Sequence, residues 1–194
     1  MNIYDFDRTL FFSDTTDEFA KFCFKYQPFL LTIYFIKMFY VHKIKREKDF
    51  YKESIAQFSY LTKIKNFDIR INDFWNKNYK RLPKIYLNKY KRDDDFILSG
   101  SPSCLLEPLM NRLNVKFKAT EYDRKKGVIT GNLMLCRNKA KFIIENEMFP
   151  IDEFYSDSIS DTPVALLAEH PYLVNYKTGE IKPWPHISEF FKNQ

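Results

Sequence analysis

The sequence predicts an α/β fold, in which a parallel sheet carries helices on both faces and a helical segment is inserted. Outside residues 15–92, short apolar segments typical of buried strands alternate with helical ones. Polar residues directly follow three of these strands, at Asp5, Ser99 and Asp157. Ligands of parallel sheets bind beyond the carboxyl ends of the strands, so we expect one shared pocket there. With 194 residues and 45% apolar composition, the chain can form one ordinary core.

The first element is a minimal strand over 2–4, which ends at Asp5. From about Asp14 to Arg92 the pattern is helical, because apolar residues recur at three-to-four spacing, as at Phe19, Phe22, Cys23 and Tyr26. A last helical stretch over 71–90 is interrupted at Pro83.

Strands and helices alternate after this insertion. We expect strands over 96–98, 115–119, 153–156 and 172–175, and helices over 103–113, 138–148 and 162–169. Residues 122–132, with Arg124-Lys125-Lys126-Gly127 at the turn, predict a β-hairpin.

The inserted segment is strongly basic. From Lys21 to Arg92 there are 18 Lys and Arg residues against 5 Asp and Glu, whereas the rest of the chain has 13 against 20. This asymmetry indicates an insertion with its own surface task. The mean hydropathy of −0.44 argues against a polytopic membrane protein. Three widely spaced cysteines fit neither a disulfide framework nor a zinc site, so we expect a cytoplasmic protein.

The residue types at the three strand ends suit phosphoryl transfer. One aspartate can attack phosphorus, and a second, two residues on, can protonate the leaving oxygen; Asp5 and Asp7 have that spacing. Charge on the transferred group needs donors and cations, which Ser99, the Gly100 amide, a lysine and Mg²⁺ would supply. Asp157 and Asp161 are placed to help hold Mg²⁺. Taken singly, each of these residues could be an ordinary turn or capping residue, but their joint order favours a site.

Four segments, 5–10, 97–102, 136–141 and 156–161, resemble in order the four motifs of the haloacid dehalogenase superfamily phosphatases. The similarity is to subfamily IB, the branch that contains the phosphoserine phosphatases, and it covers essentially the whole chain. It implies a Rossmann-like catalytic core over 1–14 and 93–194. It also implies that residues 15–92 form a helical cap that closes over the pocket and selects the substrate.

The resemblance also implies roles for individual residues. Asp5 would be the nucleophile, and Asp7 the acid/base and, through its carbonyl, a metal ligand. Asp5 and Asp157 would hold Mg²⁺, with Asp161 as a further partner of the metal and of the lysine. Ser99 would bind the phosphate. True dehalogenases of this superfamily lack the second aspartate, so Asp7 favours phosphate chemistry.

Three positions bear on how closely this chain follows the pattern. Arg8 replaces the commoner glycine of the first motif. The spacing from Cys136 assigns Lys141 to the phosphate site, whereas the phosphoserine phosphatase pattern assigns Lys139; we expect Lys141. Asp14 lies where those enzymes have a substrate-binding cap glutamate, but no arginine occurs in 53–58, which disfavours phosphoserine itself.

The most apolar run, 28–41, is too short to span a bilayer and contains Lys37. We expect a core-facing cap helix. The alternative is an interfacial helix, because a basic cluster that would attract anionic headgroups follows it: His42, Lys43, Lys45, Arg46 and Lys48. The chain also resembles the phosphatidylglycerophosphatase C enzymes around 99–102, 155–158 and 179–180.

Three functions are therefore compared. The favoured one is a Mg²⁺-dependent phosphatase acting on a small phosphomonoester. The second is a lipid-phosphate phosphatase, peripheral at the inner face of the membrane. The third, a module that binds nucleic acid or membrane through basic and aromatic residues, ranks far lower, because an aromatic helix packed on a core gives the same composition.

Overall fold

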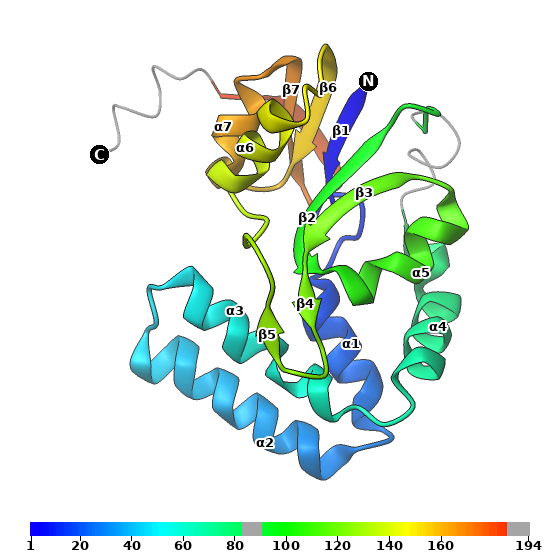
Figure 1. Ribbon diagram of the computed structural model, residues 1–194, viewed down its shortest axis with the longest axis vertical. Coiled ribbons are helices and arrows are strands. Elements are labelled where there is room, and N and C mark those ends of the chain that lie inside the picture. The colour runs from blue at the N-terminus through cyan, green and yellow to red at the C-terminus, as the bar shows by residue number, and fades with distance from the viewer. Residues whose placement is uncertain (83–90, 186–194) are drawn as a thin grey trace.

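A computed structural model describes residues 1–82 and 91–185 (Figure 1). Its centre is a six-stranded sheet in the order β3-β2-β1-β6-β7-β8. The first five strands of that order are parallel to their neighbours, and β8 runs antiparallel to β7. The strands are β1 (Asn2–Asp5), β2 (Phe96–Pro102), β3 (Lys116–Thr120), β6 (Ile151–Ser156), β7 (Ala168–Asn175) and β8 (Glu180–Pro183).

Helices cover both faces of the sheet, as the sequence predicts. Helix α5 (Ser103–Leu113) lies on one face, and α6 (Arg137–Glu145) and the short α7 (Thr162–Ala165) lie on the other (Figure 1). Because side chains alternate along a strand, Ile3 packs with the α6 and α7 side, and Tyr4 packs with the α5 side. The predicted α/β class is thereby confirmed.

The described part of the segment between β1 and β2 is mostly helical, as expected. Asp14 begins α1 by accepting a hydrogen bond from the Asp17 amide, and Asp49 caps α3 in the same way. Pro28 stands at the first turn of α2, where its missing N–H costs nothing. The helical elements here are α1 (Thr15–Phe24), α2 (Pro28–Phe39), the π-helical turn η1 (Tyr40–Lys45), α3 (Phe50–Phe58), η2 (Ser59–Lys63), α4 (Phe67–Asn78) and η3 (Tyr79–Arg81).

One hydrophobic cluster runs through this helical segment and the α5 face of the sheet. Trp75 of α4 is its clearest link, because its ring meets Phe6 and Phe11, which follow β1, at centroid distances of 5.9 and 5.5 Å. The Trp75 indole N–H donates a hydrogen bond of 2.7 Å to the Leu105 carbonyl of α5. Helix α4 is therefore fixed to the core by both packing and a buried hydrogen bond.

The predicted hairpin is present as β4 (Tyr122–Asp123) and β5 (Val128–Ile129). Gly127 adopts a φ of 72° in its turn, a conformation that favours glycine. The hairpin reaches α3 and η2 of the helical segment (Figure 1): the Tyr122 hydroxyl donates to the Phe58 carbonyl, and Arg124 donates to the Leu61 carbonyl. The helical segment thus contacts the rest of the chain on two sides.

The structure differs from the predicted elements at three places. The helix expected over 162–169 ends at Ala165, and Ala168–Asn175 is strand β7; β8 was not expected at all. Residues 168–171 include Ala, Glu and Pro, which are rare in strands, so pairing with β6 overrides their local preference. The stretch expected over 71–90 begins earlier, at Phe67, and α4 ends at Asn78; residues 83–90 lie outside the described part.

The apolar run expected as a core-facing helix is buried on one side only. Leu31, Tyr34 and Met38 of α2 face inward, while other large apolar residues of the run are exposed. Among the described residues, no helix is both long and apolar enough to cross a membrane.

Candidate active site

The site lies at the carboxyl ends of β2, β1 and β6, which are neighbours in the sheet. In the paired register, Asp5 lies opposite Leu98, so Ser99 comes one position further along. On the other side Tyr4 pairs with Tyr155, which brings Ser156 and Asp157 to the same edge. A cavity of about 190 Å³ opens above these strand ends. Of the predicted site residues, Asp5, Asp7, Asp14, Gly100, Asp157 and Asp161 line it, whereas Ser99 and Lys141 do not.

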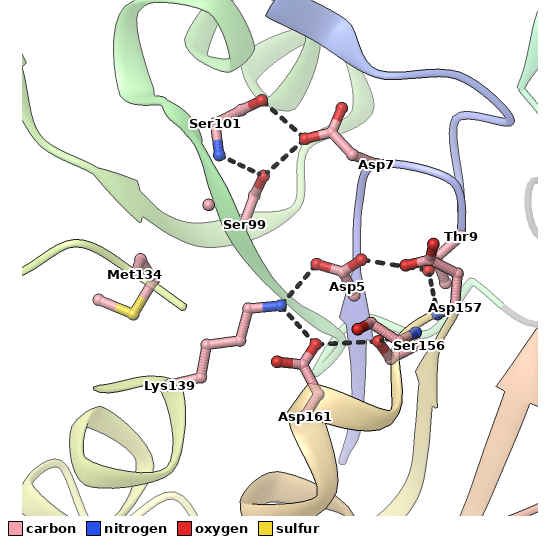
Figure 2. Close-up of polar contacts among 12 residues, drawn as sticks. Asp5, Asp7, Thr9, Ser99, Ser101, Met134, Lys139, Ser156, Asp157 and Asp161 are labelled. Atoms are coloured by element: carbon pink, nitrogen blue, oxygen red, sulfur yellow. Dashed lines mark hydrogen bonds and ion pairs between the residues drawn. The ribbon is translucent and has the colours of Figure 1, made fainter. Parts of the chain in front are cut away.

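Lys139 joins two of the predicted aspartates (Figure 2). Its ammonium lies 2.6 Å from Asp5 Oδ1 and 2.7 Å from Asp161 Oδ2, and its side chain is 2% exposed. Burial alone would lower the pKa of Lys139, but the two carboxylates raise it above its ordinary value. Burial raises the pKa of Asp5, and the Lys139 charge opposes this by favouring the carboxylate. The result is a fixed positive charge beside one oxygen of Asp5.

The expectation that Lys141 occupies the phosphate site is corrected by this geometry. Lys141 is exposed on α6 and pairs with Glu145 at 3.6 Å. Two residues along an α-helix correspond to a rotation of about 200°, so Lys139 and Lys141 cannot face the same side. Lys139 shares the inward side with Ala140 and Ile143, which are buried.

Asp7 is held by hydroxyl groups from two segments. Its Oδ1 accepts from the Thr15 amide at 2.7 Å and from the Thr15 hydroxyl, and its Oδ2 accepts from Ser101 at 2.6 Å and from Ser99 at 3.3 Å. Burial, and then the negative charge of Asp14, raise the pKa of Asp7 to about 7. A carboxyl that keeps its proton near neutral pH can act as a general acid.

Ser99 and Gly100 differ in what they offer to a ligand. Ser99 is fully buried, and its hydroxyl accepts from the Ser101 amide while donating to Asp7, so it lies beneath the cavity. Gly100 lines the cavity, and a Cβ built on it would come within 2.3 Å of a Leu135 side-chain carbon. A larger residue at position 100 would therefore collide with Leu135, which also lines the cavity.

The sequence interpretation assigned no site role to Thr9, Ser101 or Ser156. The Thr9 hydroxyl accepts from the Asp157 amide at 3.0 Å and donates to Asp5 Oδ2 at 3.2 Å (Figure 2). These bonds connect the end of β1 to the end of β6. The Ser156 hydroxyl donates to Asp161 at 2.9 Å. All three belong to the quoted motifs, so position within those motifs was the available signal.

The cavity carries an excess of negative charge. Among the described residues that line it are five aspartates, one lysine and one arginine. Burial, and then the charge of Asp5, raise the pKa of Asp157 to about 7. The carboxylates of Asp5 and Asp157 repel each other, so they are suited to share a cation.

This donor set fits Mg²⁺. Within the described residues, no group of three or more His, Cys, Asp and Glu side chains is arranged as a ready metal site. Mg²⁺ commonly uses only one or two protein carboxylates and completes its octahedral shell with waters and substrate phosphate oxygens. Asp5 and Asp157, with the surplus negative charge around them, meet that need. Asp161 is instead engaged by Lys139 and Ser156.

The helical segment forms the far wall of the cavity. Asp14 accepts from the Gln57 side chain at 3.4 Å and lies 3.9 Å from the Arg8 guanidinium. Arg8, in the place of the commoner glycine, has a φ of 59°, which is rare for a residue with a side chain. Ser54 and Phe58 of α3 complete this wall. Arg8, Asp14 and α3 therefore lie together in the wall of the cavity.

Comparison with known proteins gives one family. A family model described as haloacid dehalogenase-like hydrolase matches residues 3–166. A comparison with curated protein sequences finds no match. Solved structures that resemble the fold at low sequence identity include the following three. A protein with unknown function from Bordetella pertussis Tohama I has a TM-score of 0.76 at 16% identity, covering 99% of this chain and 94% of that one.

The other two have names that include an activity. A phosphoserine phosphohydrolase-like protein from Francisella tularensis has a TM-score of 0.57 at 16% identity, covering 88% of this chain and 86% of that one. A phosphoserine phosphatase in its apo form has the same TM-score at 17% identity, covering 87% and 82%. At these identities the likeness concerns the fold. The resemblance that the sequence motifs indicate is confirmed by the family match.

Proposed function

Since the chain belongs to the haloacid dehalogenase-like hydrolases, we propose that it hydrolyses small phosphomonoesters through a phosphorylated Asp5. The observation that carries this proposal is Lys139, held between Asp5 and Asp161 with Asp157 alongside at the strand ends. A carboxylate with one oxygen fixed by a cation can present itself to phosphorus without rearrangement.

The proposed reaction has two steps. An oxygen of Asp5 attacks phosphorus, the bond to the leaving oxygen breaks, and Asp7 gives its proton to that oxygen. Asp7 then accepts a proton from a water molecule as that water attacks the phosphorus of the aspartyl phosphate and releases Asp5. Lys139 and the Gly100 backbone amide stabilise charge on the phosphoryl oxygens.

We assign Mg²⁺ to Asp5 and Asp157, with the Asp7 carbonyl as a further ligand. When bound, the ion neutralises charge on the phosphoryl group and orients it. Asp161 acts by holding Lys139, which is its hydrogen-bonded partner at 2.7 Å.

Residues 15–92 are proposed as the cap of a core formed by 1–14 and 93–194. A cavity of about 190 Å³ favours a substrate with a small leaving group, because drug-sized ligands occupy about 300 Å³ or more. Asp14 and Arg8 would contact that group, and a cytoplasmic enzyme acting on a soluble metabolite fits these features. A lipid phosphate is the second candidate, favoured by the exposed apolar and basic residues of α2 and η1.

The test is the substitution Asp5→Asn, assayed with an aryl phosphate in Mg²⁺. We expect kcat to fall by at least about a thousandfold, because the amide cannot serve as the nucleophile. Asp68→Asn, an exposed aspartate on α4, is the matched control and should keep full activity. Circular dichroism of both variants checks that the fold is intact. Retained turnover in a folded Asp5→Asn protein would contradict the nucleophile assignment.

A further inference from the structure

The outer side of α2 and η1 carries a continuous apolar stripe. Phe29, Ile33, Ile36, Tyr40 and Ile44 recur every three or four residues, so they lie on one side of the helix. All five are exposed, with Phe29 at 81%, Ile36 at 65% and Ile44 at 63%. Side chains of this size and degree of exposure rarely line up on a monomer surface unless they bind something.

The same helix already buries a second, opposite stripe. Leu31, Tyr34 and Met38 of α2 face the interior, and Val41 of η1 continues them. On this side α2 packs against α1 and α3. The five outward residues are each more than half exposed, so they bury less surface against the described part of the chain than the inward ones do. Figure 1 shows α2 on the side of the helical segment away from the sheet.

Basic side chains lie at the end of the outward stripe. Lys43, Arg46 and Lys48 are exposed, and within residues 1–82 and 91–185 none of them forms an ion pair. Lys37 lies between Ile36 and Tyr40 along the helix. Its ammonium donates a hydrogen bond of 3.0 Å to the Ser59 hydroxyl. Apolar residues flanked by basic ones match a surface that is apolar inside and negatively charged outside.

We propose that this α2–η1 surface docks on an anionic lipid membrane. The stripe would insert among the acyl chains near the headgroups, and the basic residues would pair with the phosphates. The helix lies on the membrane rather than across it, because Leu31, Tyr34 and Met38 stay packed against the protein. This surface is separate from the catalytic cavity, so the proposal stands or falls independently of the phosphatase chemistry.

Two other occupants are disfavoured by the same observations. A second copy of the chain would bring two basic surfaces together, and their like charges would repel each other. An anionic membrane would attract the same charges. Nucleic acid would need flat rings to stack on its bases, but three of the five stripe residues are the aliphatic Ile33, Ile36 and Ile44.

Co-sedimentation of the full chain with vesicles tests the proposal. The probes are pure phosphatidylcholine vesicles and vesicles with about 30% phosphatidylserine. We expect binding to the anionic vesicles that weakens as salt is added, and little binding to the neutral ones. The double variant Ile36→Ser/Ile44→Ser should lose at least about tenfold in partitioning. Lys43→Glu/Lys48→Glu should lose a similar factor.

Matched controls separate the surface from general effects of polarity and charge. Ile144→Ser/Leu166→Ser removes two aliphatic side chains that are 55% and 58% exposed at the α6 and α7 end of the molecule. Lys116→Glu/Lys177→Glu changes the net charge by the same amount elsewhere. Both controls should bind like the unchanged chain, and so should Asp5→Asn, because binding does not require turnover.

Three results would overturn the proposal. The unchanged chain could ignore anionic vesicles. The stripe variants could bind as well as their controls. Analytical ultracentrifugation could also show a dimer that Ile36→Ser/Ile44→Ser converts to a monomer while vesicle binding is unchanged, which would assign the stripe to a second copy of the chain.

Discussion

Lys139 and Lys141 are two positions apart in the sequence but differ in burial and in their ion-pair partners. One is buried between two carboxylates and the other is exposed beside Glu145. We expect Lys139→Met to lower kcat by at least about a hundredfold, because the phosphoryl oxygens lose a fixed cation. Lys141→Met, on the same helix, should stay within about twofold. Steady-state kinetics on both variants measures this difference. An equal loss of kcat in the two variants would contradict a role for Lys139 in the site.

The choice between these lysines shows where motif spacing stops being informative. Spacing fixes the distance along the chain from Cys136, but the side of the helix is set by where α6 begins and what it packs against. Ala140 and Ile143 reveal that side once the helix is known. The aspartates were predictable because a residue that ends a parallel strand can only lie at one edge of the sheet.

Asp95 should make the stability of the protein depend on pH. Its side chain is 1% exposed, and within the described residues its Oδ1 has no hydrogen-bond partner. Burial raises the pKa of Asp95 to about 6, against about 3.9 in an unfolded chain. The folded state therefore holds the proton more tightly, and this contribution to stability is complete below about pH 4 and lost as pH rises through 6.

Asp95→Asn isolates this effect. The amide oxygen can still accept from the Arg92 amide, as Oδ2 does at 2.7 Å, and it never ionises. Urea unfolding at about pH 4 and pH 8 should show the variant gaining on the unchanged chain at the higher pH, by on the order of 1–3 kcal/mol. A difference in unfolding free energy that does not change with pH would contradict the assignment.

Among the elements, α4 depends on Trp75 for its attachment to the core. The Trp75 N–H reaches the Leu105 carbonyl, and its ring fills the space beside Phe6 and Phe11. We expect Trp75→Phe to reduce the free energy of unfolding by about 2–4 kcal/mol, since it removes a buried hydrogen bond and leaves a void. Chemical denaturation measures this, and Tyr51→Phe, an exposed aromatic on α3, serves as the control. A loss no larger than that of the control would mean that α4 is held in another way.

The elements that were predicted well are those whose local pattern agrees with their surroundings. The helix over Ser103–Leu113 and the hairpin at Gly127 were both recognisable from apolar spacing and turn residues. Strand β7 was not, because Pro171 and its neighbours favour other structures, and only the pairing with β6 makes them a strand. Likewise, α2 is apolar on both sides, so periodicity alone could not say which stripe would be buried.

For the molecule as a whole, the Mg²⁺ ion that we propose at Asp5 and Asp157 should link stability to the metal. Binding to the folded state alone should raise the melting temperature by roughly 3 °C at about 10 mM Mg²⁺. Asp157→Asn should abolish most of that rise. In EDTA, the same variant should melt at or above the temperature of the unchanged chain, because a repulsive pair has been removed. Thermal melts with and without metal give both comparisons, and an undiminished Mg²⁺ effect in the variant would place the ion elsewhere.

Finally, the hairpin at Tyr122 and the cluster around Trp75 grip the helical segment from opposite flanks. A wide hinge swing would have to break both attachments in every catalytic cycle. We therefore expect the entrance of the cavity to keep a nearly constant width. That width would select ligands by their cross-section before they reach Asp5.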